Sequence, residues 1–249
     1  MINKKKPFFS IITVVKNGEN SIEKTIESVA NQSFKNFEYI IIDGKSTDGT
    51  LKRVYKFKKK LSLIISKKDK GIYDAFNKGM RLSRGEFICF VNCGDTLRKN
   101  ALKTIFKYLS IYKELDFIFG SVKKHWGVVH GYRPEKIYYS WGFYSSHSTG
   151  FYIRKTSAKK VGFYDLRYKF HADYDFFYRA IVKKKLKGIS TKKNEIVGDF
   201  ERGGFSSTSP YHKMFFEELS IRYNNGQNLI LVAMLALYKI IKNFKNFIK

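Results

Sequence analysis

The sequence contains few cysteines, prolines and acidic residues. Only two of its 249 residues are cysteines, Cys89 and Cys93, which excludes a disulfide scaffold and favours a reducing compartment. The 21 acidic residues stand against 48 basic ones, so the formal net charge is +27 and the surface should attract polyanions. No apolar run reaches the roughly 18 residues of a transmembrane helix. Residues 1–15 lack the pattern of a signal peptide. We therefore expect neither a transmembrane helix nor a signal peptide.

The chain instead alternates between strand-like and helix-like segments, and 43% of its residues are hydrophobic, enough for a core. Continuous apolar runs, typical of strands buried on both faces, occupy residues 10–15, 37–42, 61–65, 86–91 and 116–119. Helix-spaced apolar residues lie between them, at 22–29, 51–57, 73–82 and 101–109. Asn20 and Glu23 predict a capping box at the first helix. This alternation predicts an α/β fold with a Rossmann-like, mainly parallel central sheet and helices on both faces.

The second half of the chain is less regular. Residues 121–150 predict loops and short strands, and residues 173–187 predict a helix. Gly203 and Gly204 indicate a flexible loop, and residues 211–249 predict a helical tail. We therefore expect one unit over residues 1–210, with halves at 1–120 and 121–210, followed by the tail.

Polar side chains follow several of the predicted strands. Because parallel strands end at the same edge of a sheet, these side chains should line one edge, where ligands bind in such folds. The residues are Asn17, Asp43, Asp69, Asn92 and Asp95. Asp95 suits a Mg²⁺ or Mn²⁺ held mostly by substrate phosphates and water, although a plain turn before the next helix also explains it. Asp43 suits a nucleotide contact, and the alternative for its loop is a helix cap formed by Ser46 or Thr47.

Two acids flank Tyr174 at the start of the predicted helix 173–187. The helix dipole favours carboxylates there, which by itself explains Asp173 and Asp175, but it also favours the ionised form that a general base needs. His147, between two serines in an irregular stretch, could contact a substrate. The other four histidines lack metal-ligand spacing and are expected to be ordinary surface or core residues.

Five segments of the first hundred residues resemble, in order and spacing, those of one enzyme family. They are SIITVVKN at 10–17, TIESVANQS at 25–33, YIIIDGKSTDGT at 39–50, DKGIYDAFNKG at 69–79 and GEFICFVNCGD at 85–95. Later segments at 162–165, 172–179 and 203–206 continue the resemblance, which covers residues 8–210. The chain is similar to a family-2 glycosyltransferase of the GT-A fold, particularly to members that build lipopolysaccharide and exopolysaccharide.

The resemblance implies an inverting transferase that uses Mn²⁺ or Mg²⁺ and one catalytic base. It would move one hexosyl or N-acetylhexosaminyl unit from a nucleotide-sugar, by default UDP-linked, to a hydroxyl of a glycan or lipid-linked acceptor. The first half would then bind the nucleotide-sugar and the second half the acceptor. Processive synthases of this family have several membrane-spanning helices and a Gln-x-x-Arg-Trp motif. This sequence contains neither, which favours addition of one sugar.

The resemblance also implies roles residue by residue. Asp43 matches the acid that binds the base, Asp95 the metal-binding acid, and Asp173 the catalytic base. Asn92 or Cys93 stands where the metal motif has its first acid, and Lys16 where the family often has Tyr. The implied donor-binding residues are Val14, Lys16, Asn17, Asp43, Lys70, Gly71 and Asn92. The implied acceptor-binding residues are His147, Tyr174 and Asp175, with a turn cap as the alternative for Asp175.

The tail predicts a partner of its own. Residues 229–238 are apolar, and Lys239, Lys242, Lys245 and Lys249 then alternate with Ile and Phe. This pattern predicts a basic amphipathic helix, too short to span a bilayer, that lies on an anionic membrane; a packing helix with solvated lysines is the alternative. We therefore expect a cytoplasmic protein, peripheral on the inner face of the cell membrane.

Two other functions compete with the transferase. The charge and the 17 tyrosines would suit a nucleic-acid-binding protein, but no RNP, helix-turn-helix or zinc pattern occurs, so we expect no specific nucleic acid. A non-catalytic nucleotide-sugar binder is the other alternative, because the metal motif lacks its first acid.

Overall fold

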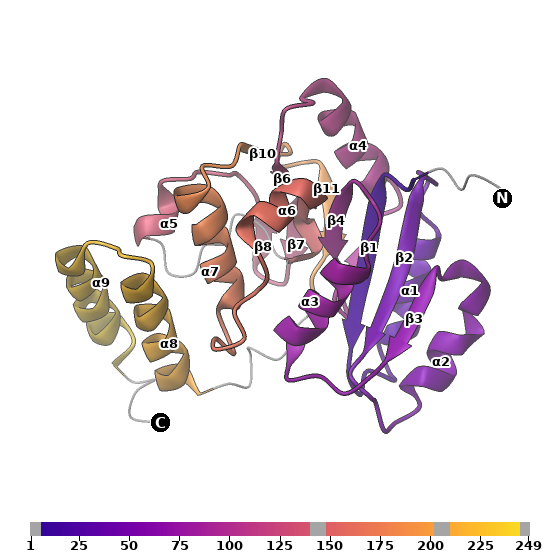
Figure 1. Ribbon diagram of the computed structural model, residues 1–249, viewed down its shortest axis with the longest axis horizontal. Helices are drawn as coiled ribbons and strands as arrows, with labels where there is room; N and C mark the ends of the chain where they lie inside the picture. The colour runs from indigo at the N-terminus through magenta and orange to yellow at the C-terminus, as the bar shows by residue number, and fades with distance from the viewer. Residues whose placement is uncertain (1–5, 140–147, 202–209, 245–249) are drawn as a thin grey trace.

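Strand β1 (Phe9–Val15) is buried along its whole length and lies inside the main sheet (Figure 1). The computed structural model describes residues 6–139, 148–201 and 210–244. Within these ranges the main sheet has seven strands in the order β10-β6-β9-β4-β1-β2-β3. The predicted strands are confirmed as β1, β2 (Phe37–Asp43), β3 (Leu63–Ser66), β4 (Phe87–Phe90) and β6 (Phe117–Phe119).

The sheet is mixed but mostly parallel. Strands β1, β2, β3 and β4 run parallel to their neighbours in this group. Strand β9 (Phe151–Arg154) lies antiparallel between β4 and β6, and β10 (Gly188–Ser190) pairs parallel with β6. The carboxyl ends of β1, β2 and β4 therefore open onto one edge of the sheet, as expected.

Helices cover both faces of this sheet, because alternate side chains of a strand point to opposite sides. Ile12 and Val14 of β1 belong to one core with Phe76 of α3 (Ile72–Leu82). Ile11 and Val15 belong to the other core, which contains the apolar stripes of three helices. These helices are α1 (Ile22–Ala30), α2 (Thr50–Lys56) and α4 (Ala101–Ile111).

A second, smaller sheet is formed mostly by the second half of the chain. Its strand order is β5-β11-β7-β8, formed by β5 (Thr96–Leu97), β11 (Ile196–Asp199), β7 (Ser121–Lys124) and β8 (Gly127–Val129). The shorter helical segments are α5 (Lys136–Tyr139), α6 (Lys155–Val161), α7 (Ala172–Tyr178) and three single turns, η1 (Lys58–Lys60), η2 (Ser148–Gly150) and η3 (Arg179–Lys183). The sequence predicted short strands here but not that they form a separate sheet.

Three local predictions are wrong. Helix α1 begins after Ser21 without a side-chain cap, and Glu23 pairs with Arg53 and Lys56 of α2 instead of closing a capping box. The residue before α2 is Gly49, so neither candidate serine nor threonine caps it. The helix predicted over 173–187 is shorter, since α7 ends at Tyr178 and one π-helical turn follows. The loop predicted at residues 203–204 lies outside the described residues.

The tail folds into two helices, α8 (Tyr211–Asn224) and α9 (Leu229–Lys242), which pack on each other at the side of the molecule away from α2 (Figure 1). Their contact contains buried charges. Glu218 accepts from Arg222 at 2.7 Å and from Lys239 at 2.9 Å, and all three side chains are almost fully buried. Burial lowers the pKa of Lys239 to about 7, with Glu218 opposing the shift.

This packing corrects the prediction for Lys239. The pattern predicts Lys239 on the basic face of a membrane-bound helix, or solvated in the packing alternative, but its side chain is buried against Glu218. Lys242 is exposed, and Lys245 and Lys249 lie outside the described residues. The outward side of α9 is apolar instead: Ile230, Met234, Leu237 and Ile241 are 61–72% exposed. Their spacing of three and four residues places them in one stripe, here called the α9 stripe. No helix in the described ranges combines the length and apolar character needed to cross a bilayer.

Glu218→Gln should lower the free energy of unfolding by about 3–5 kcal/mol, because it leaves Arg222 and Lys239 buried without a negative partner. Urea unfolding measures this, and Glu27→Gln on the exposed side of α1 should change stability by less than about 0.5 kcal/mol. Equal losses in the two variants would contradict the assigned role of the buried carboxylate.

Candidate active site

A cleft of about 900 Å³ lies at the carboxyl ends of β1 and β4 and extends to the start of α7. Most of the predicted site residues meet there. The cleft is lined by Val14, Lys16, Asn17, Lys70, Gly71, Asn92, Asp95 and Asp173 among others. Segments far apart in the sequence thus form one cavity, as the sheet-edge argument predicted.

The loops after β1 and β2 hold each other by hydrogen bonds. Asn17 adopts a positive φ of 52°, and its Oδ1 accepts from the Thr47 N–H at 2.9 Å. Asp43 is fully buried, and its carboxylate accepts from the Ser46 N–H at 3.1 Å and from the Ser66 hydroxyl at 2.6 Å. Asp43 therefore lies beneath the cleft rather than among its lining residues, and its expected contact with the base stays a prediction.

Two glycines, Gly44 and Gly71, allow the loop after β3 to lie close to the loop after β2. A Cβ on Gly44 would lie 2.4 Å from Oδ2 of Asp69, so only glycine lets that carboxylate sit against the chain. Asp69 Oδ1 in turn accepts from the Gly71 N–H at 3.1 Å, and Gly71 has a φ of 123°, which favours glycine. Asp69 thus lines the cleft beside Lys70, as its place after β3 suggested.

Asp95 joins the two sheets at the bottom of the cleft. The side chain is 3% exposed, with Oδ2 accepting from the Thr149 hydroxyl at 2.7 Å and Oδ1 from the Glu201 N–H at 3.1 Å. Thr149 precedes β9 of the main sheet, and Glu201 follows β11 of the second. These bonds hold the carboxylate in one orientation.

The turn containing Asp95 offers oxygen atoms to a hard cation. Asn92 donates through Nδ2 to Ser148 at 3.1 Å, while its buried Oδ1 has no hydrogen-bond partner within the described ranges. A carboxylate and an amide oxygen are ligands that Mg²⁺ and Mn²⁺ accept, so this turn fits such an ion. Cys93 also lines the cleft, but its thiol is a soft ligand that suits these hard cations poorly. In the part of the chain that the structure describes, no three His, Cys, Asp or Glu side chains gather to hold a metal.

Asp173 lies across the same cleft in the first turn of α7. Its Oδ1 accepts from the Tyr174 N–H at 2.8 Å and from the Tyr73 hydroxyl at 3.3 Å. Burial and the Asp173 charge raise the pKa of Tyr73 well above its ordinary value, so this phenol stays protonated. Its single proton faces two acceptors, the Phe170 carbonyl at 2.9 Å and Asp173 Oδ1 at 3.3 Å. Oδ1 is therefore held by the Tyr174 N–H, with the Tyr73 hydroxyl of α3 beside it.

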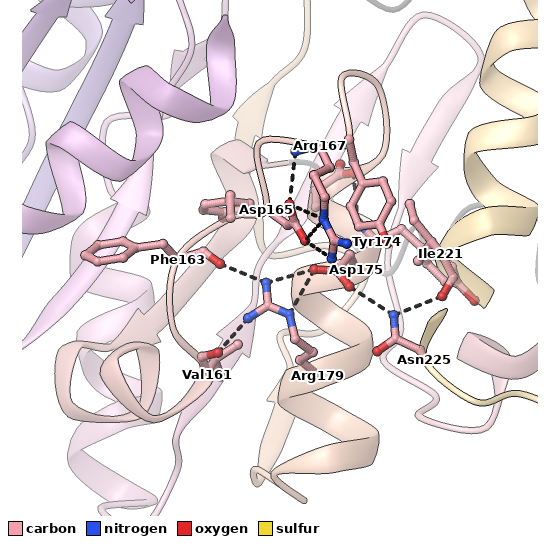
Figure 2. Close-up of polar contacts among 12 residues, drawn as sticks. Val161, Phe163, Asp165, Arg167, Tyr174, Asp175, Arg179, Ile221 and Asn225 are labelled. Atoms are coloured by element: carbon pink, nitrogen blue, oxygen red, sulfur yellow. Dashed lines mark hydrogen bonds and ion pairs between the residues drawn. The ribbon is translucent and has the colours of Figure 1, made fainter. Parts of the chain in front are cut away.

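Tyr174 and Asp175 do not reach this cleft. Tyr174 is buried, and its hydroxyl donates to the Ile137 carbonyl at 2.8 Å. Asp175 accepts from Arg179 at 2.8 Å and from Asn225, the residue after α8, at 2.9 Å (Figure 2). Arg179 also donates to the carbonyls of Val161 and Phe163, so Asp175 links α7 to its surroundings. The structure therefore does not bring these two residues to the site predicted for them, and His147 lies outside the described residues.

Two residues that sequence reasoning did not select also line the cleft. His171 precedes α7 and is buried, with Nδ1 3.7 Å from Glu217. Lys124 ends β7 and reaches in from the second sheet. Burial lowers the pKa of Lys124, and the charges of Asp95 and Asp173 oppose that shift. Neither residue follows a strand of the main sheet. The expectation that polar residues after parallel strands line one edge of the sheet therefore could not identify His171 and Lys124.

Comparison with protein families identifies the family of this chain. The model of the family described as "Glycosyl transferase family 2" matches residues 10–182, more than half of the chain. This chain belongs to glycosyl transferase family 2. The resemblance inferred from the sequence motifs is thereby confirmed.

Curated relatives of this chain are named as glycosyltransferases of PGL/p-HBAD biosynthesis and of amylovoran biosynthesis. A "PGL/p-HBAD biosynthesis glycosyltransferase" of Mycobacterium tuberculosis is 28% identical over 244 residues, covering 94% of this chain and 93% of that protein. The amylovoran biosynthesis glycosyltransferase AmsB of Erwinia amylovora is 27% identical over 194 residues, covering 69% of this chain and 63% of that protein.

Solved structures confirm the GT-A fold. TarS 1-349 of S. aureus, in complex with UDP-GlcNAc, has a TM-score of 0.68 at 20% identity, over 86% of this chain and 65% of that one. The mannosyltransferase PcManGT of Pyrobaculum calidifontis, in complex with GDP-Man and Mn²⁺, has a TM-score of 0.64 at 16% identity, over 89% and 64%. The chain spans only 39% of a longer TarS chain. At these identities the likeness shows the fold alone.

Proposed function

We propose that this protein is an inverting glycosyltransferase that moves one hexosyl or N-acetylhexosaminyl unit from a nucleotide-sugar to an acceptor hydroxyl in cell-surface glycan synthesis. The observation that carries the proposal is that Asp173 and Asp95 line one cleft at the sheet edge, in a member of family 2. UDP is the expected nucleotide, in line with the UDP-GlcNAc bound by TarS, and GDP or dTDP is the alternative. The acceptor is a glycan or a lipid-linked saccharide, in keeping with the names of the relatives.

The residues of the cleft divide the chemistry between them. Asp173 takes the proton of the acceptor hydroxyl while that oxygen attacks the anomeric carbon from the face opposite the diphosphate. The bond from the anomeric carbon to the diphosphate oxygen breaks, and the nucleoside diphosphate leaves with the electron pair. One such displacement inverts the anomeric configuration. The Tyr174 N–H holds one carboxylate oxygen of Asp173 and leaves the other for the proton.

We propose that Asp95 and Asn92, together with the donor diphosphate and water, hold a Mn²⁺ or Mg²⁺ ion. Support comes from the buried Oδ1 of Asn92, which has no hydrogen-bond partner among the described residues, and from the Mn²⁺ in the complex of PcManGT. When bound, such an ion neutralises charge on the leaving diphosphate. The donor contacts proposed for Val14, Lys16, Asn17, Lys70 and Gly71 agree with their place in the cleft lining.

We further propose a division of the chain. Residues 1–120 bind the donor, residues 121–210 provide the acceptor side, and residues 211–249 dock the enzyme on the inner face of an anionic membrane. Support for docking comes from the α9 stripe, whose apolar side chains are exposed on a chain of net charge +27. A membrane-borne acceptor would thereby be brought to the enzyme.

The donor nucleotide can be identified by thermal shift with UDP, GDP, dTDP and CMP, each with and without Mn²⁺. A ligand that binds only the folded state stabilises it by RT ln(1 + [L]/Kd), so one nucleotide should raise the melting temperature most. If no nucleotide of this panel changes the melting temperature, the proposal of a nucleotide-sugar enzyme fails.

Asp173→Asn should lower the rate of sugar transfer about 10²–10⁴-fold while the affinity for the donor nucleotide stays near that of the native protein. The amide keeps the size and the acceptor oxygen but cannot take the proton. Transfer from labelled nucleotide-sugars to membrane lipid extract measures the rate. The control is Asp165→Asn, which alters the Arg167 pair outside the cleft, and full activity in Asp173→Asn would place the base elsewhere.

Asp95→Ala should abolish the part of nucleotide affinity that depends on Mn²⁺, because it removes the one carboxylate of the proposed metal turn. Calorimetric titration of the nucleotide with Mn²⁺ and with EDTA measures this part directly. Circular dichroism and the Asp165→Asn control show whether the fold is kept. An unchanged effect of Mn²⁺ in Asp95→Ala would remove Asp95 from the metal site.

The double variant Ile230→Glu, Leu237→Glu should reduce binding to phosphatidylglycerol vesicles at least about tenfold, since each apolar side chain contributes about 1.5–3 kcal/mol when buried. Vesicle sedimentation measures the bound fraction. Ile111→Glu on α4 is the matched control, because Ile111 is 62% exposed but lies outside the α9 stripe. Unchanged vesicle binding, or loss of a dimer in ultracentrifugation instead, would reject membrane docking.

A further inference from the structure

Lys124 is a cation that the second sheet brings into the cleft. It ends β7, where successive side chains point to opposite sides, so its neighbour Lys123 is exposed while Lys124 is part-buried. Its Nζ lies 4.8 Å from the centroid of the Phe200 ring and 5.8 Å from that of Trp126. Two aromatic faces therefore confine the ammonium group where it lines the cavity.

The position of Lys124 relates it to both acids of the proposed reaction. Lys124 lines the same cleft as Asp95 and Asp173, and the charges of both acids oppose the lowering of its pKa by burial. Asp95 belongs to the turn where the donor diphosphate would be held, and Asp173 to the end where the acceptor would be deprotonated. The ammonium of Lys124 therefore lines the cavity in which the bond between sugar and diphosphate would break.

The cleft needs such a charge, because its own metal turn is sparse. Asp95 is the single carboxylate of the turn, and both of its oxygens already accept hydrogen bonds from Thr149 and Glu201. Lys16 and Lys70 also line the cleft, but both are exposed, and charges in water attract a phosphate less strongly. Lys124 is the lysine of the described lining that burial and aromatic contacts hold in place.

We infer that Lys124 binds the diphosphate of the donor and stabilises the negative charge that develops on it during transfer. This inference rests on the proposed function and adds a protein-borne cation to it. No proton leaves Lys124: its ammonium donates hydrogen bonds to the diphosphate oxygens, which receive the electron pair of the breaking C–O bond. The acceptor proton goes to Asp173, so the step is balanced.

The chain should therefore keep measurable affinity for a diphosphate without metal. Calorimetric titration of UDP and of inorganic pyrophosphate in EDTA tests this in the native protein, Lys124→Gln, Lys124→Arg and the matched control Lys123→Gln. Lys124→Gln should weaken both ligands about 10–100-fold, because a hydrogen bond between two charged groups is lost. Lys124→Arg should retain most of the affinity, and Lys123→Gln should match the native protein.

Several results would overturn the inference. One is native affinity for UDP and pyrophosphate in Lys124→Gln, with melting temperatures showing all variants folded. Another is a Lys124→Gln enzyme that keeps diphosphate affinity but has a raised KM for the acceptor, which would assign the lysine to an acceptor phosphate. If the native protein binds none of UDP, GDP and dTDP, either with Mn²⁺ or in EDTA, the proposed function itself fails. If it binds a nucleotide only with Mn²⁺, the role of Lys124 is refuted and the proposed function stands.

Discussion

Burial of the central parallel strands on both faces is the constraint on which the rest of this molecule depends. Ile12 and Val14 must be covered on one side of β1, and Ile11 and Val15 on the other, so helices occupy both faces of the sheet. Polar side chains are then excluded from most of the strand length. They are concentrated where the strands end, and the cleft forms at that edge.

Asp95 shows that the same group serves the fold and the site. Its carboxylate accepts from Thr149 beside the main sheet and from Glu201 beside the second sheet, and so connects the two. A group held by two donors needs little reorganisation when a ligand binds, which favours electrostatic catalysis. At Asp173, too, one carboxylate oxygen already accepts a hydrogen bond, from the Tyr174 N–H at 2.8 Å.

The C-terminal helices distribute charge in the opposite way to a typical surface helix. Glu218, Arg222 and Lys239 are buried between α8 and α9, and the apolar α9 stripe faces outward. Buried ion pairs add little net stability, but they fix the orientation of the helix, since any rotation would separate the charges. The network continues through Gln227 to Tyr174, so the orientation of α9 is coupled to the helix that carries Asp173.

The sequence by itself determined the strands, the sheet edge and much of the site, because these follow from local rules. Apolar runs specify buried strands, and residues such as Asn17, Asn92 and Asp95 follow them directly. Only the tertiary structure decided which side of each element is covered. Asp173 and Asp175 lie on different sides of one helix, and the packing of α7 turned the first to the cleft and the second to Arg179. The positions of two lysines also depend on the tertiary structure. Lys239 is buried because it meets Glu218, and Lys124 reaches the cleft because β7 belongs to the second sheet. Such partners lie far apart in the sequence and meet only when the chain folds.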